Sequence, residues 1–201
     1  SGVGKSNILC RYAQNKFSHD IPATIGVDLV HPQLKIDGRD MRVKMWDTAG
    51  VEAFRSTVNK FCRSADAAMI VYDITDQRSF RNVHTWLQDF RWHTKKTFPK
   101  VLLVGNKSDL DDKREVKTEV AERFARENNM TFIETSALEH VNVDCAFEAL
   151  VRKMLEAAAP GDVVPEKPNN IERFSATNAT DLCTTTGSDE FKVLIIGDSG
   201  V

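Results

Sequence analysis

Short apolar runs alternate with amphipathic stretches along most of the chain, and this alternation restricts the fold more than any other feature. Three apolar runs have the length of a buried strand: 68–73, 101–105 and 130–134. Three stretches between and after them carry apolar residues at helical spacing: 78–95, 113–128 and 143–158. Apolar strands joined by helices are typical of a parallel sheet covered on both faces. The sequence therefore predicts an α/β protein.

The first fifty residues add a helix and a hairpin to this pattern. Residues 5–16 have helical spacing, whereas 27–36 and 41–46 are strand-like. Asp37-Gly38 between these two strands is a strong hairpin-turn signal. Pro32 lacks the N–H that a central strand needs, so the first strand of the hairpin is expected at the edge of the sheet.

Composition excludes several classes of protein. The 201 residues include 27 Lys and Arg against 29 Asp and Glu, which argues against nucleic-acid binding driven by bulk charge. The basic and aromatic stretch 81–96 is better explained as an amphipathic helix than as a nucleic-acid patch. The four cysteines form no C-x-x-C pair, which favours reduced thiols in a cytoplasmic protein over a disulfide framework or a zinc site. No apolar run approaches the roughly 20 residues of a membrane span.

A change of composition divides the chain late in the sequence. Residues 159–189 are rich in Pro, Asn, Thr, Ser and Gly and show no period, which indicates a flexible linker. Residues 191–196 (FKVLII) then resemble a buried strand and lead directly into a glycine-containing turn. We therefore expect one domain built from 1–158 and 190–201, with its closing strand at 191–196.

The two ends of the chain share the tripeptide SGV. The chain opens SGVGKS and closes GDSGV, and overlaying the shared residues gives GDSGVGKS, a complete P-loop with a strand before it and a helix after it. Two arrangements explain this overlap. The domain is circularly permuted, or the chain is one slice of a tandem array repeating every 198 residues, the chain length less the three shared residues. A strand exchanged between copies, giving swapped dimers, is a third possibility.

A P-loop binds phosphate through backbone N–H groups that glycines allow to turn inward, beside the positive end of a helix. Lys5 would contact the β- and γ-phosphates, and the Ser6 hydroxyl would coordinate Mg²⁺. The candidate phosphate-binding residues are Gly2, Val3, Gly4, Lys5, Ser6, Asn7, Gly197, Asp198, Ser199 and Gly200.

Two further motifs carry groups suited to the γ-phosphate and its metal ion. Residues 47–50 (DTAG) follow a strand, where Asp47 would hold Mg²⁺ through water and the Gly50 N–H would contact the γ-phosphate. Thr24, 19 residues after Lys5, would offer its hydroxyl to Mg²⁺ and its N–H to the γ-phosphate. The predicted metal ligands are therefore Ser6, Thr24 and Asp47.

A second pair of motifs points to guanine. Residues 106–109 (NKSD) follow a strand, and the Asp109 carboxylate can accept both N1–H and the exocyclic amine of guanine. Adenine does not offer that pair of donors, so the motif selects GTP over ATP, which disfavours a P-loop kinase or ATPase. Residues 134–137 (ETSA) follow the next strand, where the Ala137 N–H would meet guanine O6 and Ser136 would orient Asp109.

In their order and spacing these motifs resemble the Ras superfamily of small GTPases. Three segments are similar to the Rab branch in particular: 25–28 (IGVD), 46–50 (WDTAG) and 71–75 (VYDIT). The resemblance implies a G domain with a six-stranded, mostly parallel sheet and helices on both faces. It also implies a GTP/GDP- and Mg²⁺-binding molecular switch in vesicle trafficking or signalling.

The resemblance also assigns roles to particular residues. It makes Phe17 the aromatic that covers the guanine edge and Lys107 the side chain that packs along base and ribose; Asn106 belongs to the same guanine motif. It places the switches, which exchange factors, activators and effectors would contact, at Ser18–Gly26 and Gly50–Arg63.

The chain departs from the family at Val51, which stands where the family has the glutamine that orients the attacking water. Valine has no hydrogen-bonding group, so GTP hydrolysis is expected to be slow, with Lys5, Thr24, Gly50 and Val51 as the catalytic positions. The alternative is a pseudo-GTPase, a non-enzymatic nucleotide-binding or scaffold module that holds nucleotide permanently or binds none. The chain as written ends without the cysteines that carry prenyl groups, so attachment to endomembranes is expected only through partners.

Overall fold

The computed structural model describes residues 2–21, 24, 27–36, 39–48, 60–97, 99–158 and 190–198. The strands are β1 (Val27–Val30), β2 (Gln33–Ile36), β3 (Arg39–Thr48), β4 (Ala67–Asp73), β5 (Lys100–Asn106), β6 (Thr131–Thr135) and β7 (Glu190–Gly197). The helices are α1 (Lys5–Gln14), α3 (Gln77–His93), α4 (Thr118–Glu127), α5 (Val143–Ala158) and the 3₁₀ helix η2 (Ser108–Lys113).

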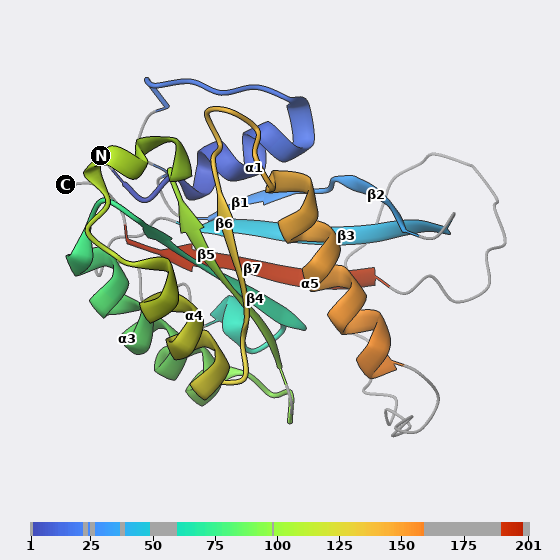
Figure 1. Cartoon of the computed structure of the whole chain (residues 1–201). Coiled ribbons are helices and arrows are strands. Elements are labelled where there is room, and N and C mark those ends of the chain that lie inside the picture. Colours follow the sequence, from blue (N-terminus) through green and yellow to red (C-terminus); the bar gives the residue numbers. More distant parts are fainter. Residues whose placement is uncertain are drawn as a thin grey trace, which may run out of the picture.

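One sheet contains all of these strands, in the order β1-β3-β7-β4-β5-β6 with β2 also beside β3 (Figure 1). Strands β3 to β7 run parallel to one another, whereas β1 and β2 are antiparallel to β3. The predicted α/β class and the mostly parallel sheet are therefore confirmed.

The last strand of the chain lies in the middle of the sheet, between β3 and β4 (Figure 1). Val193 pairs with Met45 of β3 on one side and with Ala67 of β4 on the other. Both neighbouring strands, β3 and β4, lie more than a hundred residues before β7 in the sequence. The strand expected at 191–196 is present and occupies Glu190–Gly197.

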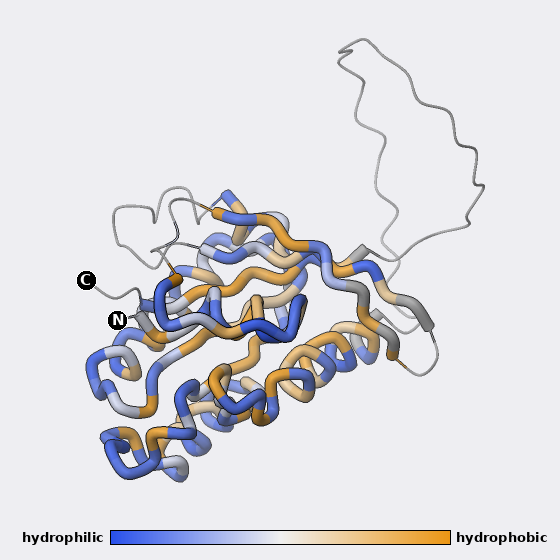
Figure 2. Tube along the Cα trace, turned by 90° about the horizontal axis from the view of Figure 1, so that it is seen from above, coloured by the Kyte–Doolittle hydropathy of each residue, from blue (hydrophilic) through white to orange (hydrophobic). Residues whose placement is uncertain are grey.

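Alternate side chains of β7 enter two hydrophobic clusters on opposite faces of the sheet. Val193 and Ile195 pack in the cluster that includes α1 and α5, whereas Leu194 and Ile196 pack in the cluster that includes α3 and α4. In Figure 2 hydrophobic residues follow the strands, and hydrophilic residues alternate with them along the helices. These four residues are at most 1% exposed, and burying each side chain contributes roughly 1.5–3 kcal/mol of transfer free energy. The strand is therefore part of the core.

Two predicted elements differ from the structure. The single edge strand expected at 27–36 is divided at His31-Pro32 into β1 and β2, both paired with β3 alone. The sheet therefore has seven strands where six were expected. The edge position predicted from Pro32 is confirmed. The helix expected from 113 begins at Thr118 instead. The N–H groups of Glu115 and Val116 both donate to the Ile74 carbonyl, at 2.9 and 3.0 Å, which holds this segment outside the helix.

Residues 159–189, the predicted linker, lie outside the described residues, as does the turn at 37–38. Among the helices of the described ranges, none combines the length and the apolar character needed to cross a bilayer.

Candidate functional site

The candidate residues gather where the parallel strands end. The register aligns Asp73 of β4 with Asn106 of β5, and Asn106 with Thr135 of β6. Gly197 at the end of β7 lies beside Val71 of β4. Ligands of open α/β sheets bind outside the carboxyl ends of the strands, so a binding site is expected at this edge.

The end of β7 meets the beginning of α1 at Lys5. The Lys5 side chain is 6% exposed, and its Nζ donates to the carbonyl oxygens of Gly197 at 2.8 Å and Asp198 at 3.0 Å. The Val3 N–H also donates to the Asp198 carbonyl, at 3.4 Å. Residues predicted from opposite ends of the sequence therefore lie in direct contact, although Ser199 and Gly200 lie outside the described residues.

Two glycines allow this close approach. Gly4, the residue before α1, has φ 91°, and a Cβ there would lie 2.4 Å from Asn106 Nδ2. Gly197 has φ 146°, and a Cβ there would lie 2.2 Å from the Val71 carbonyl oxygen. Both positions combine a backbone conformation that favours glycine with space for no side chain.

Burial makes the charge of Lys5 costly. It lowers the pKa of Lys5 from 10.5 to about 8, although the negative charges of Asp47 and Asp198 act in the opposite direction. An anion bound beside Nζ would restore the preference for the charged form. The electrostatics of this site therefore suit a phosphate group.

Ser6, Thr24 and Asp47 bring three oxygens together next to Lys5. Ser6 Oγ donates to Asp47 Oδ2 at 2.5 Å and lies 2.9 Å from Thr24 Oγ1, which is 3.3 Å from the same carboxylate oxygen. Asp47 is 4% exposed, and burial raises the pKa of its carboxyl group. Its other oxygen, Oδ1, is buried without a hydrogen-bond partner among the described residues.

These oxygens fit a magnesium ion that takes its remaining ligands from water and phosphate. Mg²⁺ prefers oxygen ligands and usually binds one or two carboxylates together with substrate phosphates. The unpartnered Asp47 Oδ1 could accept from a metal-bound water. Nowhere in the described ranges do three His, Cys, Asp or Glu side chains gather as metal ligands.

Asn106 connects the phosphate-loop candidates to the guanine-loop candidates. Its Nδ2 donates to the Val3 carbonyl at 2.9 Å, and its Oδ1 accepts from Thr135 Oγ1 at 3.2 Å and from the Ala137 N–H at 3.3 Å. The side chain is 2% exposed. Sequence reasoning placed Asn106 in a guanine motif and missed this linking geometry.

The remaining residues of the guanine loops are also close together. Ser136 Oγ donates to Asp109 Oδ1 at 2.6 Å, the contact expected from the sequence, and accepts from the Glu139 N–H at 3.0 Å. Lys107 has φ 70°, and its Nζ forms a 2.5 Å ion pair with Asp73. The Lys107 ammonium group is therefore held by a carboxylate at the end of β4.

Asn7 in the first turn of α1 and Phe17 beyond the end of α1 both lie beside the start of the predicted first switch. The Asn7 side chain exchanges two hydrogen bonds with the Ser18 backbone, at 3.1 and 3.2 Å, and so holds the first residue of the predicted first switch. Phe17 is half-buried and meets His19 edge-on, with ring centroids 4.9 Å apart. Gly50, Val51 and most of the second predicted switch lie outside the described residues.

Sequence reasoning missed Arg11, Asn82 and Trp86. Arg11 donates to the carbonyl oxygens of Ala137 at 2.9 Å and Leu138 at 3.1 Å, and so supports the loop after β6. Asn82 and Trp86 of α3 both donate to the Asp198 side chain. Their partners are more than a hundred residues away, so no local sequence signal could have found them.

A parallel sheet with a buried lysine where the end of one strand meets the start of a helix is the arrangement of a P-loop α/β protein. The sequence profile of the Ras family matches residues 1–156. The chain is 44% identical over 154 residues to the Ras-related protein YPTC6 of Chlamydomonas reinhardtii, covering 77% of this chain and 71% of that protein. It is 45% identical over 157 residues to the GTP-binding protein YPT1 of Saccharomyces cerevisiae, covering 78% and 76%. The Ras-related protein RABA1c of Arabidopsis thaliana is 42% identical over 180 residues, covering 86% and 83%.

The chain therefore belongs to the Ras family of small GTPases, with relatives of the Rab and Ypt type. The family match ends before β7, so the family relationship is carried by the first 156 residues.

Proposed function

We propose that this chain is a Rab-like molecular switch that binds GTP and GDP with Mg²⁺ and hydrolyses GTP slowly, in vesicle trafficking or signalling. The observation that carries the proposal is the position of Lys5. Its buried ammonium lies between two carbonyls at the end of β7 and beside the oxygens of Ser6, Thr24 and Asp47. A nucleotide phosphate would add negative charge beside the buried Lys5 ammonium, and its magnesium ion would add positive charge beside the buried Asp47 carboxylate.

Each group has a defined task in binding. Lys5 would hold the β- and γ-phosphates, and the N–H groups at the start of α1 would add the positive end of the helix. Ser6, Thr24 and Asp47 would hold Mg²⁺, and the bound ion would neutralise part of the phosphate charge. Asp109, oriented by Ser136, would accept two hydrogen bonds from guanine.

In hydrolysis, a water oxygen forms a bond to the γ-phosphorus while the bond to the β–γ bridging oxygen breaks, so GTP and water give GDP and phosphate. Orienting that water is the task for which Val51 has no suitable group. We expect slow intrinsic turnover and a bias toward the GTP-bound state. Activators that supply the missing group would accelerate the reaction, and the switch regions are where activators, exchange factors and effectors would dock.

Titration calorimetry with GDP, GTP, ITP and ATP, each with and without Mg²⁺, tests the binding claims. We expect GTP and GDP to bind, ATP to fail, and ITP, which lacks the exocyclic amine, to bind more weakly. Asp109→Ala should abolish the preference for guanine, and Ser6→Ala should reduce the Mg²⁺ dependence. Absence of guanine-nucleotide binding by the parent chain would refute the proposed function.

Single-turnover hydrolysis separates the switch from the second candidate, a pseudo-GTPase, which Val51 favours. We expect slow release of phosphate from the parent chain and faster release from Val51→Gln. Nucleotide binding with no turnover in either form would establish the pseudo-GTPase. A Val51→Gln variant no faster than the parent would contradict the role assigned to residue 51.

We also propose that residues 190–198 belong to the same domain as 1–158, so that the phosphate loop is assembled from both ends of a circularly permuted chain. The burial of β7 and its contacts with Lys5 support this. Light scattering should then find a monomer that binds nucleotide, whereas a swapped strand would give dimers. Sequencing the transcript upstream of the codon for Ser1 and downstream of the codon for Val201 would distinguish a permuted domain from a tandem array. In a tandem array the same strand recurs before each copy of α1.

A further inference from the structure

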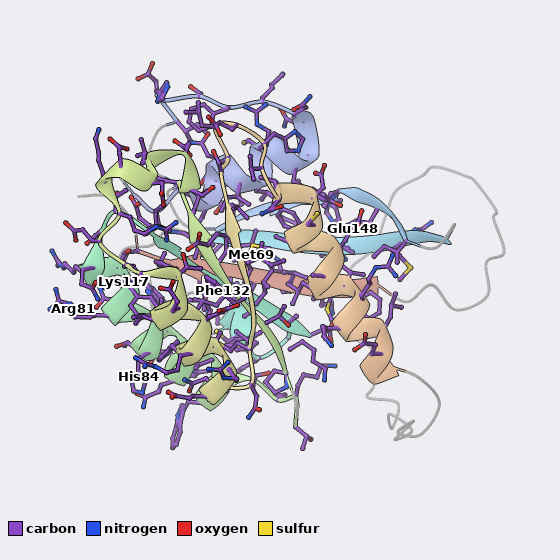
Figure 3. The ribbon with its side chains drawn as sticks, viewed as in Figure 1. Met69, Arg81, His84, Lys117, Phe132 and Glu148 are labelled. Carbon is purple, nitrogen blue, oxygen red and sulfur yellow. The ribbon has the colours of Figure 1, made fainter. Side chains whose placement is uncertain are left out.

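The side chain of Asp198 is held from outside the phosphate loop. Asn82 Nδ2 donates to Asp198 Oδ2 at 2.6 Å, and Trp86 Nε1 donates to Oδ1 at 2.9 Å, so both carboxylate oxygens are occupied. Asn82 and Trp86 are four residues apart and share one face of α3. Arg81 and His84, labelled in Figure 3, are exposed on the outer side of the same helix.

Asp198 lies just beyond the sheet. The last pair between β4 and β7 joins Val71 to Gly197, so the ladder does not include residue 198. Its backbone carbonyl nevertheless accepts hydrogen bonds from Lys5 Nζ and from the Val3 N–H. Residue 198 therefore contacts the start of α1 through its carbonyl and α3 through its side chain.

We propose that Asn82, Trp86 and Asp198 form a clamp by which α3 positions the phosphate loop. The clamp fixes residue 198 so that its carbonyl faces Val3 and Lys5, which in turn places the lysine at the start of α1. Asn82 and Trp86 are thus positioning residues, acting on the nucleotide through Asp198 and Lys5. The inference rests on the proposed function, because it names residues that prepare the same site.

The chemistry of the donors suits this task. An amide and an indole N–H are neutral, so they satisfy the carboxylate without cancelling its charge. Hydrogen bonds to a charged group are roughly twice as strong as neutral ones, and the two-point attachment fixes the orientation of the carboxylate plane. Loss of one such bond should lower the population of molecules in which residue 198 is correctly oriented by about tenfold to a hundredfold.

Nucleotide affinity and hydrogen exchange together test the clamp. Asn82 is only partly buried, so Asn82→Ala should fold. We expect it to bind GDP and GTP about tenfold to a hundredfold more weakly. Exchange of the Val3 N–H should be faster in the variant even without nucleotide. Gln88→Ala, on the exposed side of the same helix, is the matched control and should leave both measurements unchanged.

A reciprocal exchange distinguishes positioning from general stability. Asn82→Asp alone places two carboxylates face to face and should impair binding most. In the double variant with Asp198→Asn, the new amide N–H at 198 donates to the new carboxylate at 82. The amide oxygen at 198 still accepts from Trp86, so the affinity for nucleotide should recover. Failure of this double variant to recover relative to Asn82→Asp would overturn the clamp.

The two proposals fail separately. If the parent chain binds no guanine nucleotide, the proposed function is wrong, while Val3 exchange still reports on the clamp. If the parent binds but Asn82→Ala matches it in both affinity and Val3 exchange, the clamp alone is wrong.

Discussion

Replacing Asn106 by alanine should lower the free energy of unfolding substantially, although the sequence placed this residue only in a predicted guanine-binding motif. The buried side chain makes three hydrogen bonds, to Val3, Thr135 and Ala137. A net contribution of about 1 kcal/mol for each gives about 3 kcal/mol, and partners left unsatisfied in the core raise this to about 5 kcal/mol. The loss corresponds to roughly a hundredfold or more in the folding equilibrium.

Urea unfolding of the nucleotide-free chain measures this loss, because bound nucleotide would add its own stabilisation. Thr135→Val is the matched control: it keeps the volume of the side chain and removes only one of the three bonds, so it should cost about 1 kcal/mol. If Asn106→Ala proved no more destabilising than Thr135→Val, the linking role of Asn106 would be refuted.

Three further outcomes follow from the geometry. Gly197→Ala forces a Cβ against the Val71 carbonyl at φ 146°, so it should lower the unfolding free energy by at least about 1–3 kcal/mol in the same urea assay. Burial raises the pKa of Cys62 from 9.0 to about 11, which at pH 8 lowers its thiolate fraction about a hundredfold. Iodoacetamide should therefore label exposed Cys145 before buried Cys62, and Cys62 labelling should rise about tenfold per pH unit up to pH 11 in the folded chain. Arg11→Ala should accelerate GDP release in a stopped-flow assay by about tenfold, because the Ala137 loop loses two charge-assisted bonds, and an unchanged release rate would contradict its supporting role.

Local pattern was sufficient for most elements of the fold. The helix expected at 143–158 has those bounds in the structure, and the buried strands were found because apolar residues fill both faces of a central parallel strand. The elements that differ are those where a single residue or a distant bond competes with the pattern. Pro32 divides the edge strand. Hydrogen bonds to the Ile74 carbonyl keep Glu115 and Val116 outside α4, which therefore begins at Thr118.

The sequence by itself indicated which groups belong to the candidate site: the glycines, the lysine, the hydroxyls and the carboxylates were all recognisable from residue type and spacing. Only the tertiary structure decided how these groups depend on one another. Lys5 is buried between the carbonyls that end β7, Asn106 links two loops, and α3 holds Asp198. These contacts join residues about a hundred or more positions apart, and such distances are set by the packing of the whole sheet rather than by any local stretch of chain.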